Sequence, residues 1–250
     1  PDINSPAARA AGIPIPYPGF TGNVAQALRK YPQYQNIEWR GLPLGRSQYH
    51  ALEVVLEQQF AKGLQYRIGY TYSKLKNNGA ESGMGNEGIN GGVQDPVNWD
   101  TADYGLSLDD TPHVLLVGFS WDIAHDSGNS WTGAKKVLLA GWNLSGLLRY
   151  EAGRPLRITM ANDMGGLLFN TEKRPNRTGS DGVSAGGDFD PLTDNYFDRS
   201  GWQDPGPLTF GNTPRADGSV RGFKVYNEDL TVSKTFSLPK NMSMRFVAQA

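Results

Sequence analysis

Histidine, serine and acidic side chains are the residues in this chain that could catalyse a reaction or bind a metal, and their spacing argues against both roles. His50 and Glu53 lie three residues apart, a spacing that makes a metal pair on a helix; on a strand they face opposite sides. His113 and His125 form no catalytic triad with any serine, which favours interfacial or solvated histidines. Cysteine is absent, so thiol catalysis and thiolate metal sites are excluded. The sequence predicts no enzyme activity, no catalytic residue, no metal ligand and no cofactor.

Two loop segments carry the remaining candidates for ligand binding. The acidic segment Asp188–Asp194, with Asp198 beyond it, offers oxygen ligands of the kind that calcium prefers. It lacks the glycine and the closing glutamate of an EF-hand loop, so a solvated loop is preferred and calcium binding is the alternative. The glycines of Gly83–Gly92 are not followed by the lysine and hydroxyl residue of a phosphate-binding loop, which indicates a flexible connection.

The elements that must position these residues are strands. In Leu64–Ser73, apolar and aromatic residues alternate with Gln65, Arg67, Gly69, Thr71 and Ser73, which predicts one apolar and one polar face. A strand of about 9 to 11 residues crosses a bilayer at a tilt. Similar runs predict six strands at roughly 48–60, 64–74, 112–123, 138–151, 224–236 and 241–250, with 1–46 as a loop region. The pattern predicts an all-β fold, a partial antiparallel transmembrane β-barrel.

Composition and connection lengths agree with this interpretation. The 31 glycines fall mostly between the candidate strands, and the net charge of -1 argues against a nucleic-acid partner. No apolar run is long enough for a transmembrane helix, whereas a barrel hides its membrane face by alternation. The connections are in turn short, long, medium, long and short, as expected when periplasmic turns are brief and extracellular loops are large.

Aromatic residues near the strand ends predict the two membrane interfaces. If the turn Ala61–Gly63 is periplasmic, one group of aromatics falls near the periplasmic interface and another near the outer one. The first group is Phe60, Trp121, Trp142 and Phe236, and the second is Tyr72 and Tyr150. Trp142 and Tyr150 are about 27 Å apart along a strand, or about 20 Å in height at a tilt of about 40°, close to the expected apolar band of about 25 Å.

Aromatics at alternating positions have other interpretations. They also occur on the buried face of soluble β-sandwiches and on sugar-binding platforms. The opposite face of the runs, with Gln65, Arg67, Asn143 and Arg149, suits a wet lumen and would equally suit the outside of a sandwich. A secreted β-sandwich for binding or adhesion is therefore the alternative to the barrel, and an envelope hydrolase is a weaker one.

A series of short motifs, in order and at their spacing, resembles the barrel region of the Oar-like TonB-dependent receptors. No single motif is diagnostic, and together they cover nearly the whole chain. They are Tyr17–Phe20, Gln26–Arg29, Tyr31–Tyr34, Gly41–Gly45, Ser47–His50, Phe60–Leu64, Tyr70–Lys74, Asp109–His113, Gly141–Gly146, Ala152–Pro155, Arg174–Asn176, Arg221–Phe223 and Asp229–Thr231.

The resemblance implies a receptor barrel in the bacterial outer membrane, closed by a plug and energised through TonB. Residues 1–250 are then expected to be a fragment of this barrel, with the plug, the carboxypeptidase-regulatory-like domain and the TonB-contacting segment upstream. The implied function is transport of an unidentified substrate across the outer membrane. The implied partners are the lipid bilayer, the TonB complex and a small-molecule, peptide or glycan ligand bound by the long loops.

Overall fold

The computed structural model describes residues 2–35, 45–78, 94–95, 98–125, 131–161, 173–179, 189–206 and 209–250. The chain forms two compact units, each made of three separate segments. The first unit contains Pro1–Ser47, Asn77–Ser107 and Arg157–Asp217, and the second contains Gln48–Lys76, Leu108–Leu156 and Gly218–Ala250. No helix among the described residues has the length and apolar character needed to cross a membrane.

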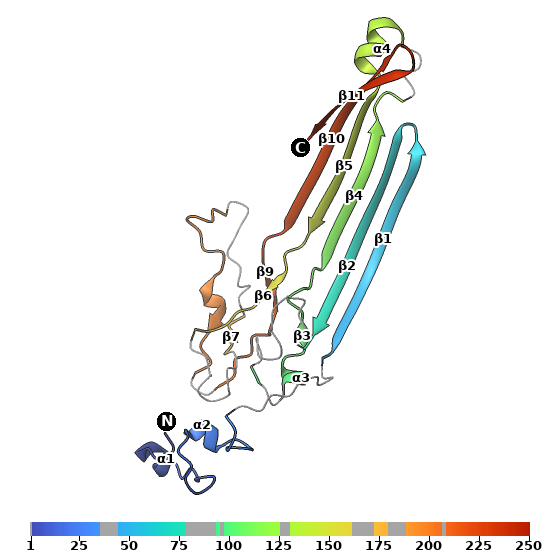
Figure 1. The fold of residues 1–250 in the computed structure, drawn as a ribbon. Coiled ribbons are helices and arrows are strands. Elements are labelled where there is room, and N and C mark those ends of the chain that lie inside the picture. The colour runs from blue at the N-terminus through green and yellow to red at the C-terminus, as the bar shows by residue number, and fades with distance from the viewer. Residues whose placement is uncertain are drawn as a thin grey trace. The chain divides into compact units, whose positions relative to one another are not determined.

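The second unit is built on an antiparallel sheet of six long strands, which lie side by side in Figure 1 in the order β1-β2-β4-β5-β10-β11. The strands are β1 (Ser47–Ala61), β2 (Leu64–Asn77), β4 (His113–Asp122), β5 (Trp142–Glu151), β10 (Val225–Leu238) and β11 (Met242–Gln249). Consecutive long strands are therefore neighbours, and β1 and β11 form the open edges of the sheet. Antiparallel neighbours that follow one another along the chain are the arrangement predicted from the alternating runs.

Short turns join the strands at one end of this sheet. Lys62 and Gly63 have φ of 52° and 81°, the left-handed pair that a tight hairpin turn requires. A Cβ on Gly63 would lie 2.5 Å from the Asp122 carbonyl oxygen, so glycine is needed for space as well as for φ. Ala61, predicted as part of the turn, is the last residue of β1. At the same end, Lys240 and Asn241, with φ of 61° and 59°, turn the chain from β10 into β11.

The start of the fourth predicted strand, at 138, is wrong. Helix α4 (Gly133–Leu139) occupies this position, and β5 begins only at Trp142. Ala, Lys and Leu are strong helix formers, and the apolar Leu138 and Leu139 can be mistaken for the beginning of a strand. Gly141 separates the two elements with φ of 75°, and the Thr235 amide donates to its carbonyl oxygen at 2.8 Å.

The first unit holds short elements between polar connections. They are α1 (Pro6–Ala10), α2 (Val24–Ala27), α3 (Trp99–Ala102), β3 (Gly105–Leu106), β7 (Asn176–Arg177), η1 (Arg199–Gly201) and β8 (Trp202–Gln203). Ser5 and Asn23 cap α1 and α2 by accepting from the Ala8 and Gln26 amides at 3.3 Å and 2.8 Å. The region 1–46, predicted as loop, thus contains two short helices among its described residues.

At the other end of the sheet, β6 (Pro155–Leu156) pairs with β9 (Asp217–Arg221). Of the residues described in the second unit, few apolar side chains are buried, and Val220 and Ala124 are among them. Large apolar side chains of the long strands are exposed instead, as Tyr72 at 53% and Phe246 at 58% show. A β-sandwich would bury one face of the sheet against a second sheet, and no such sheet occurs among the described residues of this unit.

Candidate functional site

The strand register separates the long sheet into two chemically different faces, because directly opposed residues in antiparallel strands share a face. One face, called the apolar face below, carries Leu64, Tyr66, Ile68, Tyr70, Tyr72, Leu115, Val117, Phe119, Trp121, Trp142, Leu144, Leu148, Tyr150, Leu230, Val232, Phe236, Met244 and Phe246. The other, called the polar face, carries Gln65, Arg67, Thr71, Ser120, Asn143, Ser145, Arg149, Glu151, Asn227, Asp229, Thr231, Ser233 and Arg245, together with the apolar Val114, Leu116, Leu147, Val225 and Val247. The two faces of the sheet therefore suit different surroundings, one apolar and one aqueous.

The polar face is held by hydrogen bonds and ion pairs between neighbouring strands and within them. Asn143 Nδ2 donates to Ser120 Oγ at 3.1 Å, and Arg245 Nη2 donates to Ser233 Oγ at 3.0 Å. Within β5, Arg149 Nε donates to Glu151 Oε1 at 2.6 Å. These charged, hydroxyl and amide groups are stable only against water or a polar ligand.

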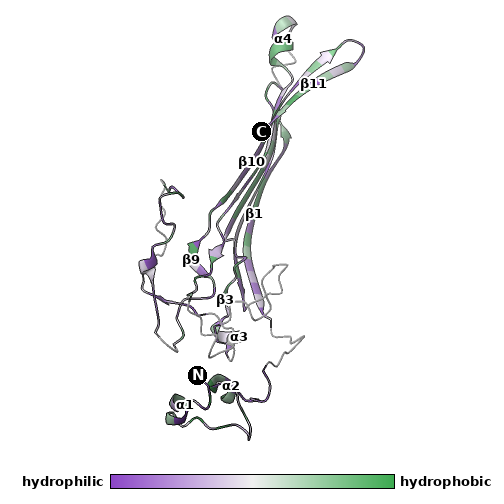
Figure 2. Cartoon of the chain, turned by 60° about the vertical axis from the view of Figure 1, so that its left-hand side comes forward, coloured by the Kyte–Doolittle hydropathy of each residue, from purple (hydrophilic) through white to green (hydrophobic). Residues whose placement is uncertain are grey.

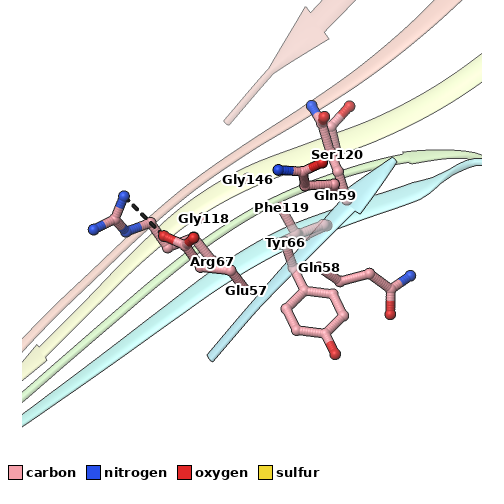
Figure 3. Close-up of a pocket in the computed structure, with 10 residues that line it drawn as sticks. Glu57, Gln58, Gln59, Tyr66, Arg67, Gly118, Phe119, Ser120 and Gly146 are labelled. Atoms are coloured by element: carbon pink, nitrogen blue, oxygen red, sulfur yellow. Dashed lines mark ion pairs between the residues drawn. The ribbon is translucent and has the colours of Figure 1, made fainter. Parts of the chain in front are cut away.

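A hollow of about 500 Å³ lies over β1, β2, β4 and β5, lined by Glu57, Gln58, Gln59, Gln65, Tyr66, Arg67, Gly118, Phe119, Ser120 and Gly146. The Arg67 Nη1 atom lies 2.9 Å from Glu57 Oε1, which places Glu57 on the polar face. Figure 3 shows Tyr66 pointing away from this ion pair. Gly118, opposite Arg67, leaves room because it has no side chain. The hollow offers one cation, one anion and several amides to a polar ligand.

A comparison with known protein families decides which two solvents the sheet separates. The family model described as "Outer membrane beta barrel domain" matches residues 1–250. The chain belongs to this outer membrane β-barrel family. This barrel domain is thus a protein of the bacterial outer membrane, and its open antiparallel sheet is part of a transmembrane barrel. Comparisons with curated proteins and with solved structures gave no match.

The register places five of the six predicted interface aromatics on the apolar face of this barrel domain. Trp121, Trp142 and Phe236 lie toward the short turns, whereas Tyr72 and Tyr150 lie toward the long connections. Phe60, one residue before the end of β1, contacts His125 with ring centroids 5.0 Å apart. Their role as two aromatic girdles stays a prediction.

Further aromatic residues of the apolar face, such as Tyr226 and His113, were not among the six predicted interface aromatics. Tyr226 pairs with Tyr150 across β5 and β10, with ring centroids 5.6 Å apart. His113 lies opposite Tyr72, and its Nδ1 is 2.8 Å from the Tyr70 hydroxyl. Tyr226 could have been predicted from the sequence, because every second residue of a strand faces the same side. The contact of His113 could not, because it depends on which strands are neighbours.

Two charged residues also lie on the apolar face, Glu228 and Lys234. Glu228 accepts a hydrogen bond from the Tyr150 hydroxyl. The Lys234 ammonium donates to the carbonyl oxygens of Leu138 and Ala140. Each charge is therefore partnered, as burial away from water requires.

The structure does not bring together the side chains that were considered as metal ligands from the sequence. Among the described residues, no group of three or more His, Asp and Glu side chains could hold a metal ion. In the acidic segment, Asp190 Oδ1 accepts from the Leu192 amide at 2.9 Å and Asp194 Oδ2 accepts from the Asp190 amide at 2.8 Å, so both stabilise a local turn. Asp188 and Gly83–Gly92 lie outside the described residues.

Asp198 has a similar local role. It caps η1, accepting from the Ser200 amide at 2.9 Å. Hydrogen bonds from Ser200 hold the pKa of the Asp198 carboxyl below its usual value.

Three motifs far apart in the sequence meet at the long-connection end of the sheet, in what we call the loop-base clamp (Asp109, Asp110, Gly153, Arg154, Arg221 and Gly222). Arg221 Nη2 donates to Asp110 Oδ2 at 2.9 Å, and Arg221 Nη1 donates to the Gly153 carbonyl oxygen at 3.1 Å. The Gly222 amide donates to the Arg154 carbonyl oxygen at 2.9 Å. A Cβ on Gly153 would lie 1.8 Å from the Gly222 carbonyl oxygen, so only glycine permits this approach.

Proposed function

We propose that this domain is the barrel wall of an Oar-like TonB-dependent receptor, which moves a substrate across the outer membrane without catalysing a reaction on it. The observation that carries the proposal is the concentration of polar side chains on one face of a sheet whose other face is predominantly apolar. Such a wall suits a wet lumen on one side and lipid on the other. The hollow beside Arg67 and Glu57 is then a recess in the lumen wall.

The motifs support the receptor assignment. Asp109–His113, Ala152–Pro155 and Arg221–Phe223, quoted above for their resemblance to Oar-like receptors, contribute the residues of the loop-base clamp. Their joint role in fixing the bases of two long connections gives a physical reason for their order in the sequence. The proposed partners are the bilayer, the TonB complex, reached through segments outside this sequence, and a small-molecule, peptide or glycan ligand.

The experiment uses the full-length protein, purified from outer membranes in detergent. Binding to the isolated C-terminal domain of TonB is measured by calorimetry, and uptake of labelled peptides and oligosaccharides is measured in cells with and without TonB. Uptake that requires both the receptor and TonB supports the proposal. A protein that inserts in the outer membrane but neither binds TonB nor depends on it for uptake would be a different kind of barrel.

A matched pair of variants tests the role of the polar recess. Arg67→Glu reverses the charge beside Glu57 on the polar face, whereas Ile68→Val changes a nearby residue on the apolar face that does not line the hollow. Uptake is expected to change with the first variant and not with the second. Equal uptake by both variants would show that the recess does not take part in substrate transport.

A further inference from the structure

The C-terminal end of helix α4 is hydrogen-bonded to side chains of the apolar face at the short-turn end of the sheet. Trp142 Nε1 donates to the Leu138 carbonyl oxygen at 2.9 Å, and Lys234 Nζ donates to the same oxygen at 3.3 Å and to the Ala140 carbonyl oxygen. Trp142 and Lys234 are cross-strand partners on the apolar face. Figure 1 shows α4 at the end of the sheet where β10 turns into β11. The end of the helix is therefore joined to the membrane-facing side of the sheet.

Lys234 fastens the helix in this position. Its side chain is 4% exposed, and its ammonium lies 5.2 Å from the Trp142 ring centroid and 5.1 Å from that of Phe236. An ammonium buried among aromatic rings requires hydrogen-bond acceptors, and the carbonyl groups at the end of α4 supply them. The end of the helix is thus fixed beside Trp142 and Phe236.

Helix α4 exposes three apolar residues next to two lysines. Val137, Leu138 and Leu139 are 56%, 65% and 49% exposed. Lys135 and Lys136 precede them and are also exposed, and the Lys135 ammonium lies 5.1 Å from the Trp131 ring centroid. Figure 2 shows the hydrophobic colour on α4, which continues the apolar face beyond the strands. Lysines beside an apolar patch and a tryptophan are typical of helices that lie in a membrane interface.

We propose that the α4 segment, Trp131–Ala140, is a lipid-binding anchor for anionic phospholipids of the periplasmic leaflet. Val137, Leu138 and Leu139 enter the boundary of the acyl chains, and Lys135 and Lys136 bind the phosphate groups. Continuity with the membrane-facing apolar face selects lipid as the occupant, and the two lysines select an anionic headgroup. The anchor rests on membership of the barrel family and is independent of TonB-dependent transport.

The absence of cysteine from these residues permits a site-specific test. Leu138→Cys is introduced in the full-length protein, on a background without other accessible cysteines, and labelled with a fluorophore. The control is Leu192→Cys, at a loop residue that is 92% exposed. Both labelled proteins are reconstituted in phosphatidylcholine vesicles containing phosphatidylglycerol. Iodide in water is expected to quench the control label and not the label at Leu138. Nitroxides near the lipid headgroups are expected to quench the label at Leu138. Equal iodide quenching at both sites would overturn the anchor.

A second arm tests the recognition of charge. With the Leu138 label, nitroxide-tagged phosphatidylglycerol is compared with nitroxide-tagged phosphatidylcholine at equal mole fraction. Each lysine is expected to enrich the anionic lipid about fivefold near the label, so Lys135→Gln with Lys136→Gln should abolish the preference. The change of electrophoretic mobility on heating verifies that each variant is folded. An unchanged preference in the folded double variant would overturn phosphate binding by these lysines.

Discussion

At the residue scale, the position of a side chain along a strand decides which solvent it meets. Ile68 lies opposite Val117 on the apolar face, and Thr71 lies opposite Val114 on the other face. Ile68→Arg is expected to lower the free energy of unfolding in lipid vesicles by about 2 to 4 kcal/mol, because it places a charge near the membrane midplane.

The matched control is Thr71→Arg, whose charge would face the lumen and should cost far less. Denaturant titration of both variants, reconstituted in the same vesicles, provides the comparison. Similar losses in the two variants would contradict the assignment of the two faces.

The loop-base clamp allows a second comparison between neighbouring residues. Asp110 is buried, and the Arg221 side chain that pairs with it is 25% exposed. Asp110→Ala should cost about 3 to 5 kcal/mol, because it removes the carboxylate that accepts from Arg221 and from the Leu75 amide.

Asp109→Ala is the control, because the Arg154 side chain opposite Asp109 is 67% exposed. Such exposed pairs contribute about 0 to 1 kcal/mol. Unfolding followed by intrinsic fluorescence measures both variants, and a larger loss at Asp109 would show that the clamp does not depend on the buried pair.

At the element scale, the hairpin between β1 and β2 depends on one glycine for two reasons. Gly63 has φ of 81°, and a Cβ there would meet the Asp122 carbonyl oxygen. Gly63→Ala therefore combines left-handed strain of about 1 to 2 kcal/mol with a backbone clash.

Gly12→Ala isolates the strain, because Gly12 has φ of 66° and open space around the position of a Cβ. We expect the stability loss, measured by denaturant titration, to be clearly larger for Gly63→Ala. A loss at Gly63 no larger than at Gly12 would mean that the turn shifts to relieve the contact.

The strands and helix α4 also show which elements the alternating pattern predicts correctly and where it is wrong. Alternation found the six long strands because every second residue meets a different solvent. It failed at 138–141, where Leu138 and Leu139 belong to α4, since a short apolar run has no period that separates a helix from a strand. Lys234 was also missed as an apolar-face residue, because its acceptors on α4 are distant in the sequence.

At the scale of the whole molecule, membership of the barrel family predicts how the protein behaves in solution. The full-length protein should sediment with outer membranes and require detergent for extraction, because the apolar face otherwise meets water. Membrane fractionation followed by size-exclusion chromatography measures this behaviour. A monodisperse protein recovered without detergent would contradict a membrane-spanning sheet.

The sequence by itself determined the all-β class, the two faces of each strand and the outer-membrane interpretation, because the period of two is a local property of the chain. Only the tertiary structure decided the convergence of Asp110, Gly153 and Arg221 in the loop-base clamp. It also decided that Lys234 and Trp142 bind the C-terminal end of α4. These contacts join residues far apart along the chain, so no local period can encode them.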